Sequence, residues 1–265
     1  MNNLLETAIT AAVEAGAEIM KIYADSFEVA LKDDNSPLTI ADENANAVIN
    51  AHLLKTNIPI ISEENKQTAY VTRKTWDTFW MVDPLDGTKE FIKRNGEFTV
   101  NIALIKNNKP VLGVIYVPVT KTMYYAIVYE EKAYKVTLDG HFYSDEIHSK
   151  VKEELIPSKA DSAEIKVVAS RSHLNEETAA FMAHLEKQGK QVKTVSVGSS
   201  LKFCLVAEGK ATIYPRFAPT MEWDTAAGHA ICNAVGLKVM QTASDKELRY
   251  NKEQLLNPYF IVRKF

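Results

Sequence analysis

Two aspartates that stand three residues apart carry the strongest chemical signal in this sequence. Asp83 and Asp86 belong to the run D-P-L-D-G-T, directly after the apolar segment 78–82. That segment is rich in strand-forming residues, and Pro84 predicts that the strand ends there because proline cannot donate to a sheet ladder. Both carboxylates would then leave the carboxyl end of a strand, where α/β folds tend to hold ligands. With no basic residue beside them they indicate a hard divalent cation, and magnesium fits best.

The same run is also typical of a plain turn, because proline fixes φ, aspartate caps the turn and Gly87 permits a positive φ. Taken alone, it favours a turn and a metal site about equally. A second acidic strand end favours the site, since the apolar segment 58–61 is followed by Ser62, Glu63 and Glu64. One acidic strand end is ordinary, whereas two indicate a shared site.

Four segments in the second half place polar groups at the ends of expected strands and helices. The run 198–202 joins a strand to a helix, whose free backbone N–H groups could bind phosphate. Arg216 follows a strand between aromatic residues and suits bidentate binding of phosphate. The run 170–173 ends another strand, and Asp224 stands at the expected start of a helix. Each has a simpler interpretation when taken alone: a serine or aspartate N-cap, a solvated lysine or a lone surface arginine.

The hypothesis of a site depends on whether these features converge. Four carboxylates would form a cage of the kind that holds paired magnesium ions, namely Glu63, Asp83, Asp86 and Asp224. Ser199, Lys202 and Arg216 would then supply a cationic wall for an anionic ligand. Metal ligands beside phosphate-binding groups indicate phosphoryl chemistry.

The elements that would position these residues can be predicted from periodicity. Apolar residues at helical spacing predict a helix over 2–24, and a capping box at Thr39–Asp42 predicts a second one through Leu54. His52 is expected to lie on the face of that helix rather than to be a ligand. Strands joined by short connections, which suggest antiparallel hairpins, are expected near residues 58–62, 78–83, 98–106, 111–117, 121–129 and 132–137.

After residue 160 the pattern alternates between strand and helix. Strands are expected at 165–170, 192–197, 211–214 and 237–240, with helices at 176–188, 199–208 and 224–235. The polar segment 137–160 predicts a boundary between a half over 1–145, which carries most metal ligands, and a half over 160–265, which carries the substrate-binding residues and Asp224. The fold class is therefore mixed α/β.

Composition restricts the function class. The chain has 265 residues, of which 46% are hydrophobic and 25% charged, and a formal net charge of -3, which gives no sign of binding to a nucleic acid polymer. Its two cysteines, Cys204 and Cys232, fit neither a disulfide framework nor a metal motif, so a reducing, cytoplasmic setting is expected. We expect neither a signal peptide nor an integral membrane segment.

The motifs resemble those of the magnesium-dependent, lithium-sensitive inositol monophosphatase superfamily. The resemblance rests on the acidic pair at 63–64, the D-P-x-D-G-T run and the downstream W-D at 223–224. Longer stretches at 83–105, 198–211 and 222–230 resemble the bacterial 3'(2'),5'-bisphosphate nucleotidases of the CysQ type. The likeness covers essentially the whole chain, although Ala218 stands where glycine is expected and the segment 137–160 matches nothing specific.

This resemblance implies a layered αβαβα sandwich with the active site between the two halves. Glu63, Asp83 and the carbonyl of Leu85 would hold one Mg²⁺, while Asp83, Asp86 and Asp224 would hold a second. Glu63 would help to hold a weaker third ion, so two to three ions are expected. Thr88 and Asp42 match the pair that orients and deprotonates the attacking water. The residues implied around the substrate are Glu63, Asp83, Leu85, Asp86, Gly87, Thr88, His173, Gly198, Ser199, Lys202, Arg216 and Asp224.

The implied reaction converts adenosine 3',5'-bisphosphate to AMP and phosphate in the setting of sulfate assimilation. An inositol-phosphate or sugar-phosphate phosphatase on the same scaffold is the main alternative, and a non-catalytic nucleotide-binding protein is another. A covalent haloacid-dehalogenase mechanism is excluded, since its nucleophile would fall on Pro84. The partner is a small nucleotide. The resemblance leaves open the oligomeric state and a peripheral association with the inner membrane.

Overall fold

Two long helices form the outer layer at the N-terminus. The computed structural model describes residues 1–24, 29–31, 37–142, 152–158, 163–169 and 175–264. Helix α1 (Asn2–Ala24) and helix α2 (Ile40–Leu53) follow the predicted bounds within one residue, and η1 (Leu54–Thr56) continues α2. Both bury an apolar stripe against the neighbouring sheet, as helices of this period do. A two-stranded ribbon, β1 (Val29–Leu31) with β2 (Pro37–Thr39), lies between them in the chain.

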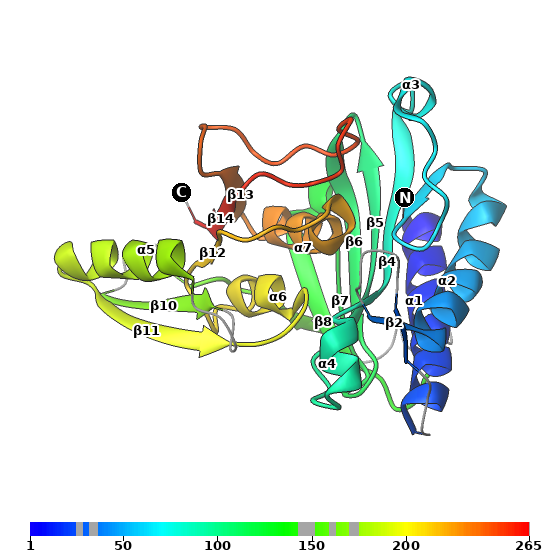
Figure 1. The fold of residues 1–265 in the computed structure, drawn as a ribbon, viewed down its shortest axis with the longest axis horizontal. Coiled ribbons are helices and arrows are strands. Elements are labelled where there is room, and N and C mark those ends of the chain that lie inside the picture. The colour runs from blue at the N-terminus through cyan, green and yellow to red at the C-terminus, as the bar shows by residue number, and fades with distance from the viewer. Residues whose placement is uncertain (25–28, 32–36, 143–151, 159–162, 170–174, 265) are drawn as a thin grey trace.

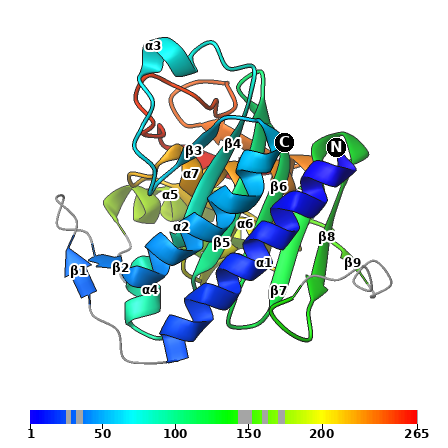
Figure 2. The ribbon, with the colours of Figure 1, turned by 90° about the vertical axis from the view of Figure 1, so that its right-hand side faces the viewer.

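A sheet of seven strands forms the second layer, in the spatial order β3-β4-β5-β6-β7-β8-β9. Its strands are β3 (Ile60–Ser62), β4 (Thr78–Asp86), β5 (Thr99–Lys106), β6 (Lys109–Val117), β7 (Thr122–Ile127), β8 (Lys132–Thr137) and β9 (Glu153–Glu154). The short helices α3 (Tyr70–Arg73), α4 (Thr88–Ile92) and η2 (Val128–Glu130) lie in its connections. Figure 2 shows α1 and α2 running side by side across one face of this sheet.

Two details of this sheet correct the sequence prediction. Strands β3 and β4 are parallel, because the chain crosses over through α3 instead of making a hairpin. Strand β4 also does not end at Pro84 but continues to Asp86, with an irregular register between Asp83 and Asp86. At a bulge a residue leaves the ladder, so the missing N–H of proline costs little there.

The second half of the chain covers the other face of the sheet. Helices α6 (Leu201–Ala207) and α7 (Glu222–Ala234) pack on it, and smaller sheets lie beyond them (Figure 1). Strands β10 (Glu164–Ala169) and β11 (Gln191–Ser196) are parallel and carry α5 (Glu176–Lys187). Strands β12 (Tyr214–Arg216), β14 (Phe260–Arg263) and β13 (Lys238–Gln241) form a three-stranded antiparallel sheet in that order.

These layers confirm the predicted αβαβα sandwich (Figure 1). A single core joins the seven-stranded sheet to α6, α7 and the C-terminal strands through residues such as Phe79, Phe203, Trp223 and Phe260. The division of the chain at 137–160 stays a prediction. Among the described residues, no helix is both long enough and apolar enough to cross a bilayer.

Candidate active site

Three acidic side chains meet where two parallel strands end. Glu63 follows β3 and Asp83 lies in the irregular part of β4, so the two strands deliver them to the same edge of the sheet. Asp224 reaches this edge from the first turn of α7. One carboxylate oxygen from each of the three lies within 4.8 Å of the others. The structure thus brings together carboxylates that the sequence separates by up to 161 residues.

The cluster concentrates negative charge around one buried member, Asp83, while Asp224 is half-buried and Glu63 is the most exposed of the three. Burial raises the pKa of Asp83 well above its usual value, and neighbouring carboxylates raise it further: Glu63, Asp86, Asp224 and Asp42. Burial likewise raises the pKa of Asp224 to about 8, and Asp86 is the largest charged contributor. A divalent cation at this point would relieve the repulsion, and oxygen ligands of this kind are those that Mg²⁺ prefers. The residues present therefore fit a magnesium site.

Asp86 is held in place by Ser200 and Asn101, neither of which was among the predicted site residues. Its Oδ2 accepts hydrogen bonds from the backbone N–H and the hydroxyl of Ser200, at 2.6 and 2.7 Å, and lies 3.3 Å from Asn101 Nδ2. Asn101 also donates to Ser200 Oγ at 2.8 Å, and Ser200 Oγ lies 2.9 Å from the Asp224 carbonyl oxygen. A signal was available, because Thr99 and Asn101 are polar residues on one face of an otherwise apolar strand.

Asp224 combines a structural task with a place in the cluster. Helix α7 begins at Glu222, not at Asp224, so this aspartate is the third residue of the helix instead of its N-cap. Its Oδ2 accepts the Met221 N–H at 2.9 Å, which closes the helix start from within the first turn. The capping role considered for Asp224 is therefore compatible with its position beside Asp83.

The turn after β4 has the geometry that the D-P-L-D-G-T run predicted. Gly87 adopts a φ of 96°, which favours glycine, and is the N-cap of α4. The Leu85 N–H donates to Asp83 Oδ1 at 3.2 Å, and the Thr88 hydroxyl donates to the Leu85 carbonyl oxygen at 3.4 Å. Asp42 is buried in the first turn of α2, close enough for its charge to affect Asp83.

The turn at 198–202 differs from the predicted phosphate cradle. The Gly198 N–H donates to Glu97 Oε2 at 2.8 Å, and the Ser200 N–H donates to Asp86. These N–H groups are therefore already bonded to carboxylates, because α6 begins only at Leu201 and acidic side chains pack against the turn. Lys202 remains as the charged donor of this turn.

Two cations lie close enough to Asp86 and Asp224 for their charges to interact. Lys202 Nζ donates to the Ser199 carbonyl oxygen at 2.8 Å, and burial lowers the pKa of this lysine, an effect that the charge of Asp86 opposes. Arg216 ends β12 and donates through Nη2 to the Pro219 carbonyl oxygen at 3.0 Å. Arg216 Nε is buried and has no hydrogen-bond partner among the described residues.

A cavity of about 450 Å³ is lined by Asp86 and Asp224 and by these two cations, whereas Glu63, Asp83, Leu85 and Thr88 are not among its lining residues. Its volume lies within the usual range for a small-molecule site. Lys89 of α4 and Lys93, the C-cap of α4, also line it, as do Glu90 and Glu97, and none of these was among the predicted site residues. The predicted residues that line it are Asp86, Gly87, Gly198, Ser199, Lys202, Arg216 and Asp224. His173 lies outside the described residues.

Comparison with known proteins agrees with this geometry. The chain matches the inositol monophosphatase family over residues 1–259. It is 48% identical over 264 residues to the 3'(2'),5'-bisphosphate nucleotidase CysQ of Salmonella typhimurium, covering 98% of this chain and 99% of that protein. It is 45% identical to the protein of the same name from Escherichia coli, again over 98% of this chain and 99% of that protein.

Solved structures extend the comparison. The crystal structure of CysQ from Bacteroides thetaiotaomicron has a TM-score of 0.89 and 52% identity, covering 99% of this chain and 97% of that one. The SuhB protein of Bartonella henselae shares the fold, with a TM-score of 0.75 and 21% identity over 99% of this chain and 94% of that one. The predicted resemblance is confirmed, and the chain belongs to the inositol monophosphatase family.

Proposed function

We propose that this protein is a magnesium-dependent, lithium-sensitive 3'(2'),5'-bisphosphate nucleotidase that converts adenosine 3',5'-bisphosphate to AMP and phosphate. The main support is that one cavity of about 450 Å³ is lined both by the carboxylates of Asp86 and Asp224 and by the cations of Lys202 and Arg216, and that Asp224 also belongs to the cluster with Glu63 and Asp83. A metal-assisted phosphatase needs carboxylates to hold the metal ions. A substrate that carries two phosphate groups needs cations to bind the phosphate that is not cleaved. Relatives at 45% to 48% identity carry the name of this activity.

The cation ligands would come from the acids and one carbonyl group at the ends of β3 and β4 and the start of α7. Glu63, Asp83, Leu85, Asp86 and Asp224 would hold two magnesium ions, and Glu63 would also contact a third. Bound magnesium supplies positive charge that lowers the pKa of water and stabilises negative charge on the phosphoryl oxygens. Asp86 suits this role because Ser200 and Asn101 fix the orientation of its carboxylate.

Thr88 and Asp42 would prepare the water molecule that attacks phosphorus. Thr88 lies at the start of α4, and its hydroxyl is oriented toward the Leu85 carbonyl group. In the proposed step the water oxygen bonds to phosphorus while the bond from phosphorus to the 3'-oxygen breaks on the opposite side, and the departing 3'-oxygen takes a proton from a second water molecule to give the 3'-hydroxyl of AMP. The proton of the water passes through the Thr88 hydroxyl to the Asp42 carboxylate.

The 5'-phosphate, which is not cleaved, would bind at the cationic wall. Lys202 and Arg216 would pair with it, and Ser199, Gly198 and His173 would contact the nucleotide. Lys89 and Lys93 also line this cavity, where Glu90 and Glu97 offset their charge, so Lys202 and Arg216 are the preferred phosphate partners. A cytoplasmic location and a role in sulfate assimilation, both implied by the family resemblance, remain proposals.

A side-by-side assay tests the assignment. Adenosine 3',5'-bisphosphate and inositol 1-phosphate are compared at equal concentration with Mg²⁺, with EDTA and with Mg²⁺ plus lithium, while phosphate release is measured. We expect faster release from the bisphosphate, loss of activity in EDTA and inhibition by lithium. Faster turnover of inositol 1-phosphate would contradict the nucleotidase assignment.

A further inference from the structure

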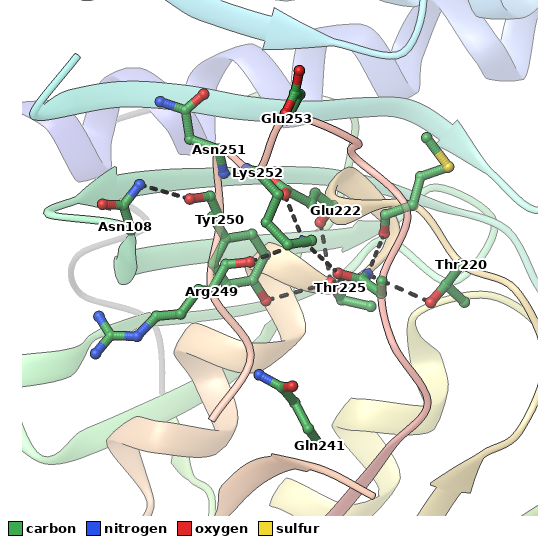
Figure 3. Close-up of polar contacts among 12 residues, drawn as sticks. Asn108, Thr220, Glu222, Thr225, Gln241, Arg249, Tyr250, Asn251, Lys252 and Glu253 are labelled. Carbon is green, nitrogen blue, oxygen red and sulfur yellow. Dashed lines mark hydrogen bonds and ion pairs between the residues drawn. The ribbon is translucent and has the colours of Figure 1, made fainter. Parts of the chain in front are cut away.

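The segment 249–257 lies across the N-terminal turn of α7 and encloses a buried acid (Figure 3). Glu222, the first residue of α7, is fully buried. Its Oε1 accepts hydrogen bonds from Lys252 Nζ at 2.6 Å and from the Lys252 backbone N–H at 3.0 Å. Its Oε2 accepts the Asn251 N–H at 2.5 Å. Both carboxylate oxygens are thus bonded to neighbouring residues of one segment.

The same segment is also bonded to helix α3. Arg73, the last residue of α3, is buried and donates through Nη1 to Asn251 Oδ1 at 2.7 Å. Asn251 returns a bond from Nδ2 to the Arg73 carbonyl oxygen at 2.6 Å. Arg73 Nη2 also donates to the Glu253 carbonyl oxygen at 2.8 Å. A continuous relay therefore runs from α3 through Asn251 to Glu222 and α7.

One end of this relay carries a metal-site acid, and the other end lies in the connection between the two strands that deliver Glu63 and Asp83. Helix α3 lies in the crossover that begins after β3 with Glu63 and leads into β4 with Asp83. Helix α7 carries Asp224 two residues after Glu222. Repulsion among the three carboxylates, when charged and without a cation, would tend to separate α7 from the ends of β3 and β4. Bonds between α3 and α7 oppose this separation.

A buried ion pair is a costly way to stabilise a fold. In this pair Glu222 is fully buried and the Lys252 side chain is 30% exposed. Burying a charge costs several kcal/mol, and apolar residues of the same volume often stabilise a protein as well or better. The several directional hydrogen bonds of this relay restrict the position of α7 more narrowly than apolar contacts would. A cation site needs its ligands held to within ~0.5 Å. The relay is thus better suited to positioning than to stabilisation.

We infer that the relay of Arg73, Asn251, Glu222 and Lys252 positions the cation site by holding Asp224 against Glu63 and Asp83. None of the four is a catalytic residue; each acts through the backbone of α3 or α7. The inference rests on the proposed function, since it assigns the relay a role at the magnesium site. It predicts that a broken relay lowers the affinity for Mg²⁺ more than it changes the binding of the nucleotide.

Two variants break the ion pair while keeping the shape of the side chain: Glu222→Gln and Lys252→Met. Mg²⁺ affinity is measured by calorimetry on the metal-free protein, and KM for adenosine 3',5'-bisphosphate is measured at saturating Mg²⁺. Loss of supporting residues around metal ligands lowers affinity about 10- to 100-fold, so we expect a loss of about tenfold with KM changed less than twofold. Lys252→Arg keeps the charge and should restore most of the affinity.

A matched control separates positioning from stability. Glu208 ends α6, its side chain is 4% exposed, and its Oε2 pairs with Lys210 at 3.0 Å and Lys135 at 3.2 Å, away from the cation site. Glu208→Gln should lower the melting temperature and leave Mg²⁺ affinity unchanged. If the Glu222 and Lys252 variants also keep wild-type Mg²⁺ affinity, the positioning role is overturned. If the wild type binds no Mg²⁺ in calorimetry, the proposed function fails, and the inference fails with it.

Discussion

Ser200 is bonded to Asp86 twice, through its backbone N–H and through its hydroxyl, and the same hydroxyl oxygen lies 2.9 Å from the Asp224 carbonyl oxygen. One small residue at the start of α6 thus orients one proposed magnesium ligand and contacts the backbone of another. Because a hydrogen bond to a charged group contributes about 1.5–3 kcal/mol, the hydroxyl has a measurable effect.

The Ser200→Ala variant should therefore need more Mg²⁺ for half-maximal activity. The backbone N–H still bonds Asp86, so we expect a shift of several-fold and not a complete loss. A magnesium titration of phosphate release measures it. Ser158→Ala, which removes a 2.7 Å hydrogen bond to the Gly209 carbonyl oxygen away from the acids, is the control and should leave the titration unchanged.

Asp83→Asn should have opposite effects on stability and activity. Asp83 is 1% exposed, and burial among other carboxylates raises its pKa, so without a cation it destabilises the fold. The amide should raise the free energy of unfolding in EDTA by about 1–2 kcal/mol, abolish turnover and remove the rise in melting temperature that Mg²⁺ gives the wild type. Asp77→Asn, at an exposed position, should change none of these quantities. A metal-free Asp83→Asn protein less stable than the wild type would contradict this account.

Lys202→Ala should mainly raise KM for substrates with a 5'-phosphate. Loss of a charged hydrogen bond of about 1.5–3 kcal/mol predicts an increase of roughly 10- to 100-fold. Hydrolysis of adenosine 3'-monophosphate, which has no 5'-phosphate, should change much less. Steady-state kinetics with both substrates measure this, and Lys187→Ala on the exposed last turn of α5 is the control. An unchanged KM for the bisphosphate would show that Lys202 does not bind this phosphate.

Much of the fold could be predicted because its elements have strong local signals. The apolar stripes of α1 and α2 and the alternation after residue 160 depend on near neighbours, and their bounds agree within a few residues. Strand β14 was not predicted, since Phe260–Arg263 is a short segment that forms a strand only by pairing with β12 and β13. The parallel pairing of β3 and β4 likewise depends on how the chain crosses over, which no local pattern records.

The site could be predicted to the level of residue types. The carboxylates were found because the sequence places acids at two strand ends, and the structure brings Glu63, Asp83 and Asp224 together. Their supporting residues were missed, because the bonds of Ser200 to Asp86 and of Arg73 to Asn251 join positions 114 and 178 residues apart. The hydrogen bond from the Gly198 N–H to Glu97 was also not predicted, because these residues are 101 positions apart.

A buried histidine makes the stability of this protein depend on pH. His229 lies in α7, is 1% exposed, and its Nδ1 is 2.9 Å from the Tyr250 hydroxyl oxygen. Burial lowers its pKa from 6.5 to about 4. The unfolded chain therefore takes up a proton near pH 6.5 while the folded protein does not. The contribution of the neutral His229 to the free energy of unfolding is therefore fully present above pH 6.5, and it is lost as the pH falls toward 4.

The expected loss between pH 7.5 and pH 5 is about 2 kcal/mol in the free energy of unfolding. His229→Gln keeps a polar partner for Tyr250 but cannot take up the proton, so its stability should fall less over this range. Urea unfolding of both proteins in EDTA at the two pH values measures the difference, in which contributions from the acidic cluster cancel. His184→Gln, on the exposed face of α5, should behave like the wild type. Equal losses in the wild type and in His229→Gln would show that His229 is not the group that titrates.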